Sequence, residues 1–185
     1  MNLEAISKEI SYALRHNPQQ YDLTLDEQGW VSVVALISAL NRHGRFKSLS
    51  ISGIEKMILV SEKKRHEIQN GKIRALYGHS TIEKIEKEPL KPPDVLYHGT
   101  THKYVDSIFV IGLISKNRQY VHLSGDVNTA ITVGKRKDDN PIILIIYAKQ
   151  AWDDGVSFYL GNENIWLADG VPSKYIGILS SYKQA

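Results

Sequence analysis

Cationic and imidazole side chains recur in short motifs, and they are the groups in this sequence best suited to chemistry. Arg15 and His16 end the stretch LRH just before Pro18, Arg65 closes KKR, and Arg118 precedes YVHLS. Arginine stays charged at any working pH and binds phosphate through paired hydrogen bonds, whereas histidine exchanges protons near neutrality. These residue types favour phosphate chemistry. Arg15 and His16 also suit a routine role at a helix C-terminus, where cations complement the helix dipole.

Strand-like runs later in the sequence carry a second set of polar groups. His98, Gly99 and Thr100 end the run LYHGT, while His122 and Ser124 lie in YVHLS. A glycine after a strand lets the backbone approach a ligand closely, and the imidazoles and hydroxyls can hydrogen-bond that ligand. A plain strand-to-helix turn, or a buried structural histidine, would give the same residues. Two such histidines on neighbouring strands favour a ligand site.

The composition is that of an ordinary globular protein without thiol chemistry. Of the 185 residues, 42% are hydrophobic and 23% charged, and none is cysteine, which excludes disulfides, zinc-thiolate sites and a thiol nucleophile. No metal-ligand set is apparent in the sequence. The N-terminal stretch MNLEAISKEI lacks a basic start followed by an apolar core, and no apolar run reaches membrane-spanning length. We therefore expect a cytoplasmic protein with no membrane partner.

The elements that must position these groups fall into two parts. The segment EKIEKEPLKPPD, residues 83–94, holds three prolines and no apolar periodicity, so it is predicted to link a domain at 1–82 to one at 95–185. Residues 1–93 hold 14 Lys and Arg against 11 Asp and Glu, whereas residues 94–185 hold nine of each. The first part is thus the better candidate for a polyanionic partner.

Apolar periodicity predicts helices in the first part. One stripe consists of Leu3, Ile6, Ile10 and Leu14. A second helix is expected to begin after the N-cap Ser32 and to end at Gly44, and a third to span residues 52–59. Two short strand-like runs joined by Asn70-Gly71 then predict a hairpin. Three helices followed by a hairpin is the element order of a winged helix.

The second part reads as strands with interspersed helices. The strand-like runs are LYHGT, YVHLS, PIILIIYAK, VSFYL, NIWLA and YIGILS. Helices are expected at residues 103–109 and 126–133, which makes the whole chain α+β with a mostly antiparallel sheet. Neither a dinucleotide-binding glycine motif after a strand nor a P-loop occurs.

Eight short motifs together resemble one known family over nearly the whole chain. They are LRH at 14–16, D-x-x-GW at 26–30, KKR at 63–65, IRA at 73–75, GHS at 78–80, LYHGT at 96–100, YVHLS at 120–124 and NIWL at 164–167. In their order and spacing the chain resembles the RNA 2′-phosphotransferases, the NAD-dependent enzymes that remove an internal 2′-phosphate from tRNA. The resemblance implies a winged-helix lobe for RNA, followed by a lobe related to ADP-ribosyltransferases.

The resemblance also implies which residues act. The expected catalytic residues are Arg15, His16, Arg65 and Arg118, drawn from both lobes around one phosphoryl group. Arg65 is preferred to Arg74 as the third member because its distance from LRH fits better, and Arg74 stays open as the alternative. The NAD pocket is expected at His98, Gly99, Thr100, His122 and Ser124, and the RNA contacts at Lys64, Arg74, His79 and Ser80. Where many relatives have phenylalanine after KKR, this chain has His66.

The reaction implied by the resemblance has two steps. The RNA 2′-phosphate first displaces nicotinamide from NAD, giving an ADP-ribosylated RNA intermediate. Attack by the neighbouring ribose hydroxyl then gives 2′-OH RNA and ADP-ribose 1″,2″-cyclic phosphate. We expect a monomer that binds 2′-phosphorylated RNA and NAD and requires no metal. Two alternatives stay open, namely a single-step ADP-ribosyltransferase acting on terminal nucleic-acid phosphates and a non-enzymatic winged-helix regulator that binds nucleic acid.

Overall fold

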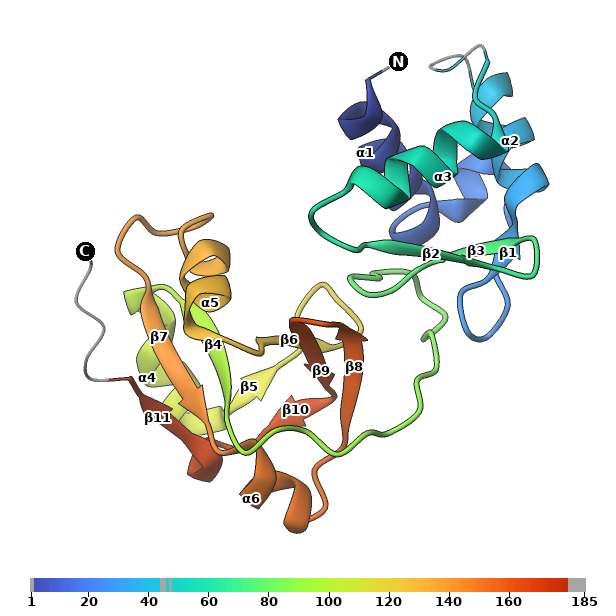
Figure 1. Cartoon of the computed structure of the whole chain (residues 1–185). Coiled ribbons are helices and arrows are strands. Elements are labelled where there is room, and N and C mark those ends of the chain that lie inside the picture. Colours follow the sequence, from blue (N-terminus) through green and yellow to red (C-terminus); the bar gives the residue numbers. More distant parts are fainter. Residues whose placement is uncertain (1, 44–45, 47, 180–185) are drawn as a thin grey trace. The chain divides into compact units, whose positions relative to one another are not determined.

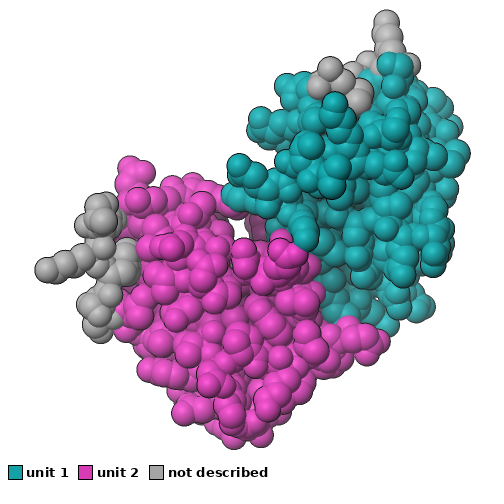
Figure 2. Space-filling model, viewed as in Figure 1, with its two compact units in different colours: residues 1–87 teal, residues 88–185 magenta. Residues whose placement is uncertain are grey.

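The structure is a computed structural model that describes residues 2–43, 46 and 48–179. The chain divides into two compact units, unit 1 at residues 1–87 and unit 2 at residues 88–185 (Figure 2). Both units combine helices with β-sheet, and every strand pair among the described residues is antiparallel (Figure 1). The predicted α+β class with mostly antiparallel sheet is confirmed.

The helices of unit 1 follow the predicted apolar stripes. They are α1 (Leu3–Arg15), the 3-10 turn η1 (Pro18–Tyr21), α2 (Val33–Arg42) and α3 (Ile51–Val60). Asn2 caps α1 by accepting a hydrogen bond from the backbone N–H of Ala5, and the hydroxyl of Ser32 caps α2 through Ala35. Gly44, the predicted end of the second helix, lies outside the described residues.

A small sheet closes unit 1. Its strands are β1 (Val31–Ser32), β2 (His66–Gln69) and β3 (Lys72–Ala75), in the order β1-β3-β2. The predicted hairpin turn has Asn70 and Gly71 at φ 50° and 71°, the left-handed region that a tight two-residue turn requires. The two-residue β1 was not predicted, because a strand so short has no periodicity of its own and exists only through its pairing with β3.

The core of unit 1 lies between the helices and this sheet. Its fully buried side chains include Ile6, Ile10, Leu14, Leu36, Leu40, Ile54, Met57 and Ile73. Because Ile6, Ile10 and Leu14 occupy one face of α1, Arg15 at its end falls outside the core. The packing of α1 therefore determines where Arg15 and His16 emerge.

The segment predicted as a linker is docked along much of its length. Ile85 is buried and the Glu86 N–H donates to the Glu27 carbonyl, which attaches its first half to unit 1. In its second half the Leu90 N–H donates to Phe158, and the Asp94 carbonyl accepts from the backbone of α6 (Ala148–Asp153). The boundary between the units, after residue 87, lies inside this segment.

Unit 2 is built on a six-stranded antiparallel sheet with the order β11-β7-β4-β6-β9-β8. The strands are β4 (Leu96–Thr100), β6 (Val121–Ser124), β7 (Ile142–Ile146), β8 (Phe158–Asn162), β9 (Ile165–Ala168) and β11 (Ile176–Ile178). A separate two-stranded sheet pairs β5 (Leu113–Ile114) with β10 (Gly170–Val171). All six predicted strand runs contain a strand, although Ser180 at the end of the last run lies outside the described residues.

The helices of unit 2 are α4 (His102–Ile111), α5 (Val127–Gly134) and α6, with the 3-10 turn η2 (Ser173–Tyr175). The first two match the predicted helices, and Asp126 caps α5 by accepting from Thr129. The helix α6 was missed. The run PIILIIYAK was predicted as one strand, but the chain leaves the sheet at Tyr147, where its N–H pairs with the carbonyl of Tyr175.

Candidate active site

Arg15 is held at the C-terminus of α1 by contacts with distant segments. Its guanidinium donates to the backbone carbonyl of Arg65 at 3.2 Å, and its Cζ lies 5.0 Å from the centre of the Tyr77 ring. Gly78 adopts φ +91° beside it, and a Cβ built there would lie 3.5 Å from the guanidinium. The side chain therefore turns away from the carbonyls of its own helix and toward β2 and the segment after β3.

Two hydrogen bonds connect the end of α1 to the GHS motif, one through the His16 ring and one through the backbone of Arg15. Its Nδ1 lies 2.8 Å from the Ser80 hydroxyl, and the Ser80 N–H donates to the Arg15 carbonyl at 2.9 Å. These two bonds fix the orientation of an exposed imidazole at the end of α1. LRH, KKR and GHS, which are far apart in the sequence, thus meet in unit 1.

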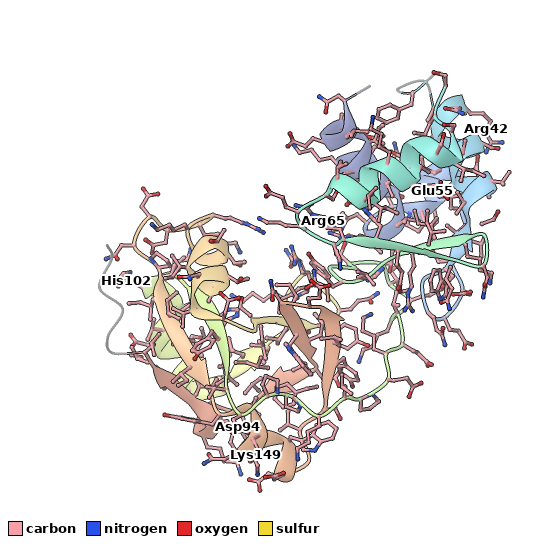
Figure 3. All side chains as sticks on the ribbon, viewed as in Figure 1. Arg42, Glu55, Arg65, Asp94, His102 and Lys149 are labelled. Atoms are coloured by element: carbon pink, nitrogen blue, oxygen red, sulfur yellow. The ribbon has the colours of Figure 1, made fainter. Side chains whose placement is uncertain are left out.

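A buried histidine lies beside the two arginines. The His66 side chain is 4% exposed, and its Nε2 lies 3.0 Å from the hydroxyl of Ser11 on α1. Burial, together with the nearby guanidiniums of Arg15 and Arg65, lowers the pKa of His66 to about 3. His66 is therefore neutral at physiological pH, and the local positive charge belongs to the arginines. Figure 3 shows Arg65 just before β2, where the chain returns from α3.

Arg74 belongs to a different group of contacts. It pairs with Glu67 across the β2–β3 hairpin, and its Cζ stacks 4.4 Å from the centre of the Trp30 ring. It also donates to the Gln28 carbonyl at 3.5 Å. Arg15 thus contacts the backbone of residue 65, whereas Arg74 is engaged by Glu67 and Trp30. Lys64, the neighbour of Arg65, is exposed.

The two predicted RNA contacts of the GHS motif differ in burial, since His79 is buried and Ser80 is exposed. The His79 side chain is 3% exposed and packs beside Gly29, where an added Cβ would lie 3.6 Å from its Nε2. The Ser80 hydroxyl is engaged by His16. The His79 ring is thus buried within unit 1, whereas Ser80 lies at its surface.

In unit 2 the two predicted histidines meet where the sheet is interrupted. β4 and β6 pair only through Tyr97 and Ser124. Where a regular ladder would continue, the His98 ring donates from Nδ1 to the His122 carbonyl at 2.9 Å, and the His122 ring donates from Nδ1 to the Tyr120 carbonyl at 3.0 Å. Because a carbonyl only accepts, both rings carry their proton on Nδ1 when neutral. Burial lowers the pKa of His98, so this ring stays neutral.

Gly99 serves the packing of α5. A Cβ at this position would lie 2.3 Å from the carbonyl oxygen of Ala130 and 3.0 Å from the backbone of Gly134. There is no room for a side chain at this position, because the backbone of Gly99 packs directly against the backbone of α5. This contact is one structural reason for a glycine at position 99, and the close approach of a ligand to its backbone stays a prediction.

The remaining predicted pocket residues divide between the two faces of the sheet. Alternation along β4 places His98 and Thr100 on the face of Leu96 and Gly99 on the other. Ser124 pairs directly with Tyr97, which puts Ser124 on the Gly99 side. Thr100 and Ser124 are 7% and 5% exposed. The structure thus brings His98 and His122 into contact and keeps both hydroxyls buried nearby in the sheet.

Arg118 lies in the exposed segment between β5 and β6. Two residues later the chain is anchored by Tyr120, whose buried ring packs edge-on against Tyr159 at a centroid distance of 5.2 Å. Arg118 therefore projects from a loop whose fixed end leads into the strand that carries His122.

The described residues hold neither a cluster of metal ligands nor a helix suited to a membrane. No three His, Asp or Glu side chains at positions 2–43, 46 and 48–179 come close enough together to bind a metal ion. None of the helices in that part of the chain combines the length and apolar character needed to span a membrane.

Guanidinium groups gathered with an imidazole on an α+β scaffold are of the kind that proteins use to bind and transfer phosphate groups. Sequence comparison gives the particular family. A family model described as "RNA 2'-phosphotransferase, Tpt1 / KptA family" matches residues 2–170. The chain belongs to this family, which confirms the resemblance carried by its motifs.

Similar proteins occur in bacteria and archaea. A probable RNA 2′-phosphotransferase of Acetivibrio thermocellus is 54% identical over 171 residues, covering 92% of this chain and 94% of the relative. One from Bacillus thuringiensis subsp. konkukian is also 54% identical, over 173 residues and 94% of each chain. A probable RNA 2′-phosphotransferase 1 of Archaeoglobus fulgidus is 38% identical over 174 residues, covering 94% of this chain and 80% of the relative.

Proposed function

We propose that this chain is an NAD-dependent RNA 2′-phosphotransferase that removes an internal 2′-phosphate from tRNA or a similar RNA. The products are RNA with a free 2′-hydroxyl, nicotinamide and ADP-ribose 1″,2″-cyclic phosphate. Family membership supports the RNA 2′-phosphate as substrate. The main structural support for the proposed phosphate chemistry is the contact between Arg15 and the Arg65 backbone, beside the hydrogen-bonded pair of His16 and Ser80.

Unit 1 supplies the groups that suit the phosphate. Arg15 is half-buried and held by a carbonyl and an aromatic ring, so little conformational freedom is given up when it binds an anion. His66 stays neutral near the two arginines, so the positive charge available to an anion here comes from the guanidiniums. Arg15, His16 and Arg65 are therefore proposed to bind the 2′-phosphate, with Arg118 of unit 2 as the fourth catalytic residue.

Unit 2 supplies groups that fit a nicotinamide ribose. With Nδ1 bonded to the His122 carbonyl, His98 presents Nε2 as an acceptor for a sugar hydroxyl. The edge of β4 beyond Tyr97 has no partner in β6, so its backbone groups match the donor and acceptor of a carboxamide. Thr100, on the face of His98, and His122, Ser124 and Gly99 are the further residues proposed to contact NAD. Ser124 lies on the face of Gly99, which packs against α5.

The proposed chemistry needs charge stabilisation and one proton transfer. First, a 2′-phosphate oxygen bonds to the anomeric carbon and the bond to nicotinamide breaks, which gives an ADP-ribosylated RNA. The neighbouring hydroxyl then attacks phosphorus, its proton passes to His16, and the bond between phosphorus and the RNA 2′-oxygen breaks. Charge develops on the phosphate oxygens, where fixed guanidiniums stabilise it without reorganising. His16 delivers the proton to the departing RNA oxygen.

Unit 1 is proposed to be a winged helix that holds the RNA, and unit 2 an ADP-ribosyltransferase-like lobe that holds NAD. The element order α1-β1-α2-α3-β2-β3 with sheet order β1-β3-β2 supports the first assignment. The sheet interruption at His98 supports the second. Lys64 and Arg74 are proposed RNA contacts, because both are cations of unit 1, one beside Arg65 and the other on the hairpin.

The decisive experiment incubates the protein with an internally 2′-phosphorylated oligonucleotide, with and without NAD, and identifies the products by mass spectrometry. We expect loss of the phosphate only with NAD, and ADP-ribose 1″,2″-cyclic phosphate as the product. His16→Ala should fold normally and lose about 10²–10⁴-fold in rate. Arg118→Ala should accumulate ADP-ribosylated RNA, because charge stabilisation in the second step is weakened.

Other products would overturn the proposal. ADP-ribosylation of a terminal phosphate without cyclic phosphate would indicate a single-step transferase. Nucleic-acid binding with no reaction, and with no thermal stabilisation by NAD, would indicate a regulator.

A further inference from the structure

Three lysines surround one tyrosine on the surface of unit 2, outside the residues assigned above. Lys116 Nζ lies 3.9 Å and Lys103 Nζ 4.7 Å from the centre of the Tyr104 ring. A hydrogen bond from Lys103, together with the charges of Lys103, Lys116 and Lys137, lowers the pKa of the Tyr104 phenol. The charge of Lys137 also acts on His98 of β4. These four residues, Lys103, Tyr104, Lys116 and Lys137, form the Tyr104 cluster.

The cluster is the centre of a local excess of positive charge. Residues 102–111, 115–120 and 135–140 together hold six Lys and Arg against three Asp, although residues 88–185 as a whole hold ten Lys and Arg against ten Asp and Glu. Of those three carboxylates, Asp138 lies 3.4 Å from the ring of His102, which Figure 3 labels on α4. The neutral total for unit 2 therefore conceals a basic surface built from three segments.

The exposure of the cluster indicates the kind of ligand. Lys103, Lys116 and Lys137 are all exposed, whereas the Tyr104 ring is half-buried and packs on the core of unit 2. Pockets for small cofactors are concave and bury most of the ligand. Lysines on an open surface around a fixed hydroxyl instead suit the phosphates of a polynucleotide, which are contacted from one side and keep their other oxygens in water.

We propose that the Tyr104 cluster binds a backbone phosphate of the RNA substrate, so that unit 2 as well as unit 1 contacts RNA. Gathering three ammonium groups is unfavourable by itself, and an anion relieves their repulsion. Lys116 lies two residues before Arg118 in the same loop. RNA bound at the Tyr104 cluster therefore lies close to a proposed catalytic residue. The inference rests on the proposed function only in taking RNA as the substrate.

The test compares two double variants of the full chain that remove equal charge from unit 2. One is Lys103→Gln with Lys116→Gln. The control is Lys149→Gln with Lys174→Gln, on α6 and η2, where both lysines are paired with aspartates outside the cluster. Binding of a fluorescent single-stranded RNA without NAD is measured by anisotropy over a range of salt concentrations. Turnover of the 2′-phosphorylated oligonucleotide gives KM for RNA and for NAD separately.

We expect the cluster variant to bind RNA about tenfold more weakly than the control. Its salt dependence should be shallower, by about 0.7 in the slope of log K against log salt for each RNA phosphate that the variant no longer neutralises. The KM for RNA should rise and the KM for NAD stay unchanged. Tyr104→Phe, which keeps the ring and removes the hydroxyl, should give a smaller change of the same kind.

Two results would overturn the inference. RNA affinity equal to that of the control would show that the cluster binds no RNA phosphate. A rise in the KM for NAD, with RNA affinity unchanged, would assign the lysines to the diphosphate of the cofactor. Because the anisotropy measurement needs no turnover, it decides the inference even if the wild-type protein fails to remove a 2′-phosphate, which would contradict the proposed function alone.

Discussion

His16 and Ser80 are 64 residues apart in the sequence, yet His16 Nδ1 lies 2.8 Å from the Ser80 hydroxyl. The backbone of Ser80 simultaneously bonds the Arg15 carbonyl at the end of α1. One residue therefore closes the helix end and orients the imidazole. We therefore propose that Ser80, besides its predicted contact with RNA, positions the proposed proton carrier.

Ser80→Ala should lower kcat about tenfold and leave the KM for RNA nearly unchanged. One net hydrogen bond contributes about 1 kcal/mol, close to the roughly 1.4 kcal/mol that corresponds to a factor of ten in rate. The pH–rate profile should also change, which a loss of stability alone would not cause. Ser80→Thr, which keeps a hydroxyl, should restore both. If Ala and Thr behave alike, Ser80 does not orient His16.

Arg65→Ala and Arg74→Ala should separate chemistry from RNA binding. Arg65 lies beside Arg15 and His66, so its removal should lower kcat by two or more orders of magnitude, as expected for a charged group that stabilises a transition state. Arg74 is tied to Glu67 and Trp30, so its removal should mainly raise the KM for RNA. The reverse result in steady-state kinetics would exchange their roles.

His66 should make unit 1 acid-sensitive. Its folded pKa of about 3 lies below the ordinary value of about 6.5, so between those pH values the unfolded chain binds more protons. The free energy of unfolding should therefore decrease as the pH is lowered through this window, by on the order of 2 kcal/mol between about pH 7 and pH 5. Well above the ordinary histidine pKa, His66 is neutral in both the folded and the unfolded chain, so the stability of unit 1 is not reduced by this residue.

The matched variant is His66→Phe, which keeps an aromatic ring and cannot titrate. Hydrogen exchange of peptides from unit 1 at about pH 7 and pH 5, on either side of the ordinary histidine pKa, measures the effect. The variant should lose much less stability at the lower pH than the wild type does. An identical acid dependence in both proteins would mean that His66 is not the responsible group.

Gly99→Ala should destabilise unit 2. The new methyl group would lie 2.3 Å from the Ala130 carbonyl oxygen, and backbone on both sides can move only by displacing α5 from β4. We expect a cost of roughly 1–3 kcal/mol, as for other over-packed sites, and a melting temperature lower by several degrees. At Gly125, an added methyl would meet its nearest atom at 3.6 Å, so Gly125→Ala should melt as the wild type does. Equal melting temperatures for both variants would contradict the packing role of Gly99.

Local patterns in the sequence were sufficient for most helices and strands. The apolar stripe of α1, the Ser32 cap and the Asn70-Gly71 turn each act within a few residues, so they could be read directly. β1 and β10 could not be predicted, because each is two residues long and exists only through a partner strand. α6 was missed because its first residues continue a β-rich run, and the chain turns only where Tyr147 meets Tyr175.

The sequence alone determined the family, the two-part organisation of the motifs and the residue types suited to phosphate, because these are properties of residue identity and order. Only the tertiary structure decided what each side chain contacts. It put Arg15 against the residue-65 backbone, committed Arg74 to Glu67 and Trp30, buried His79, and turned Gly99 toward α5. Such contacts join residues tens of positions apart, and their energies depend on burial and distance, which a linear pattern does not contain.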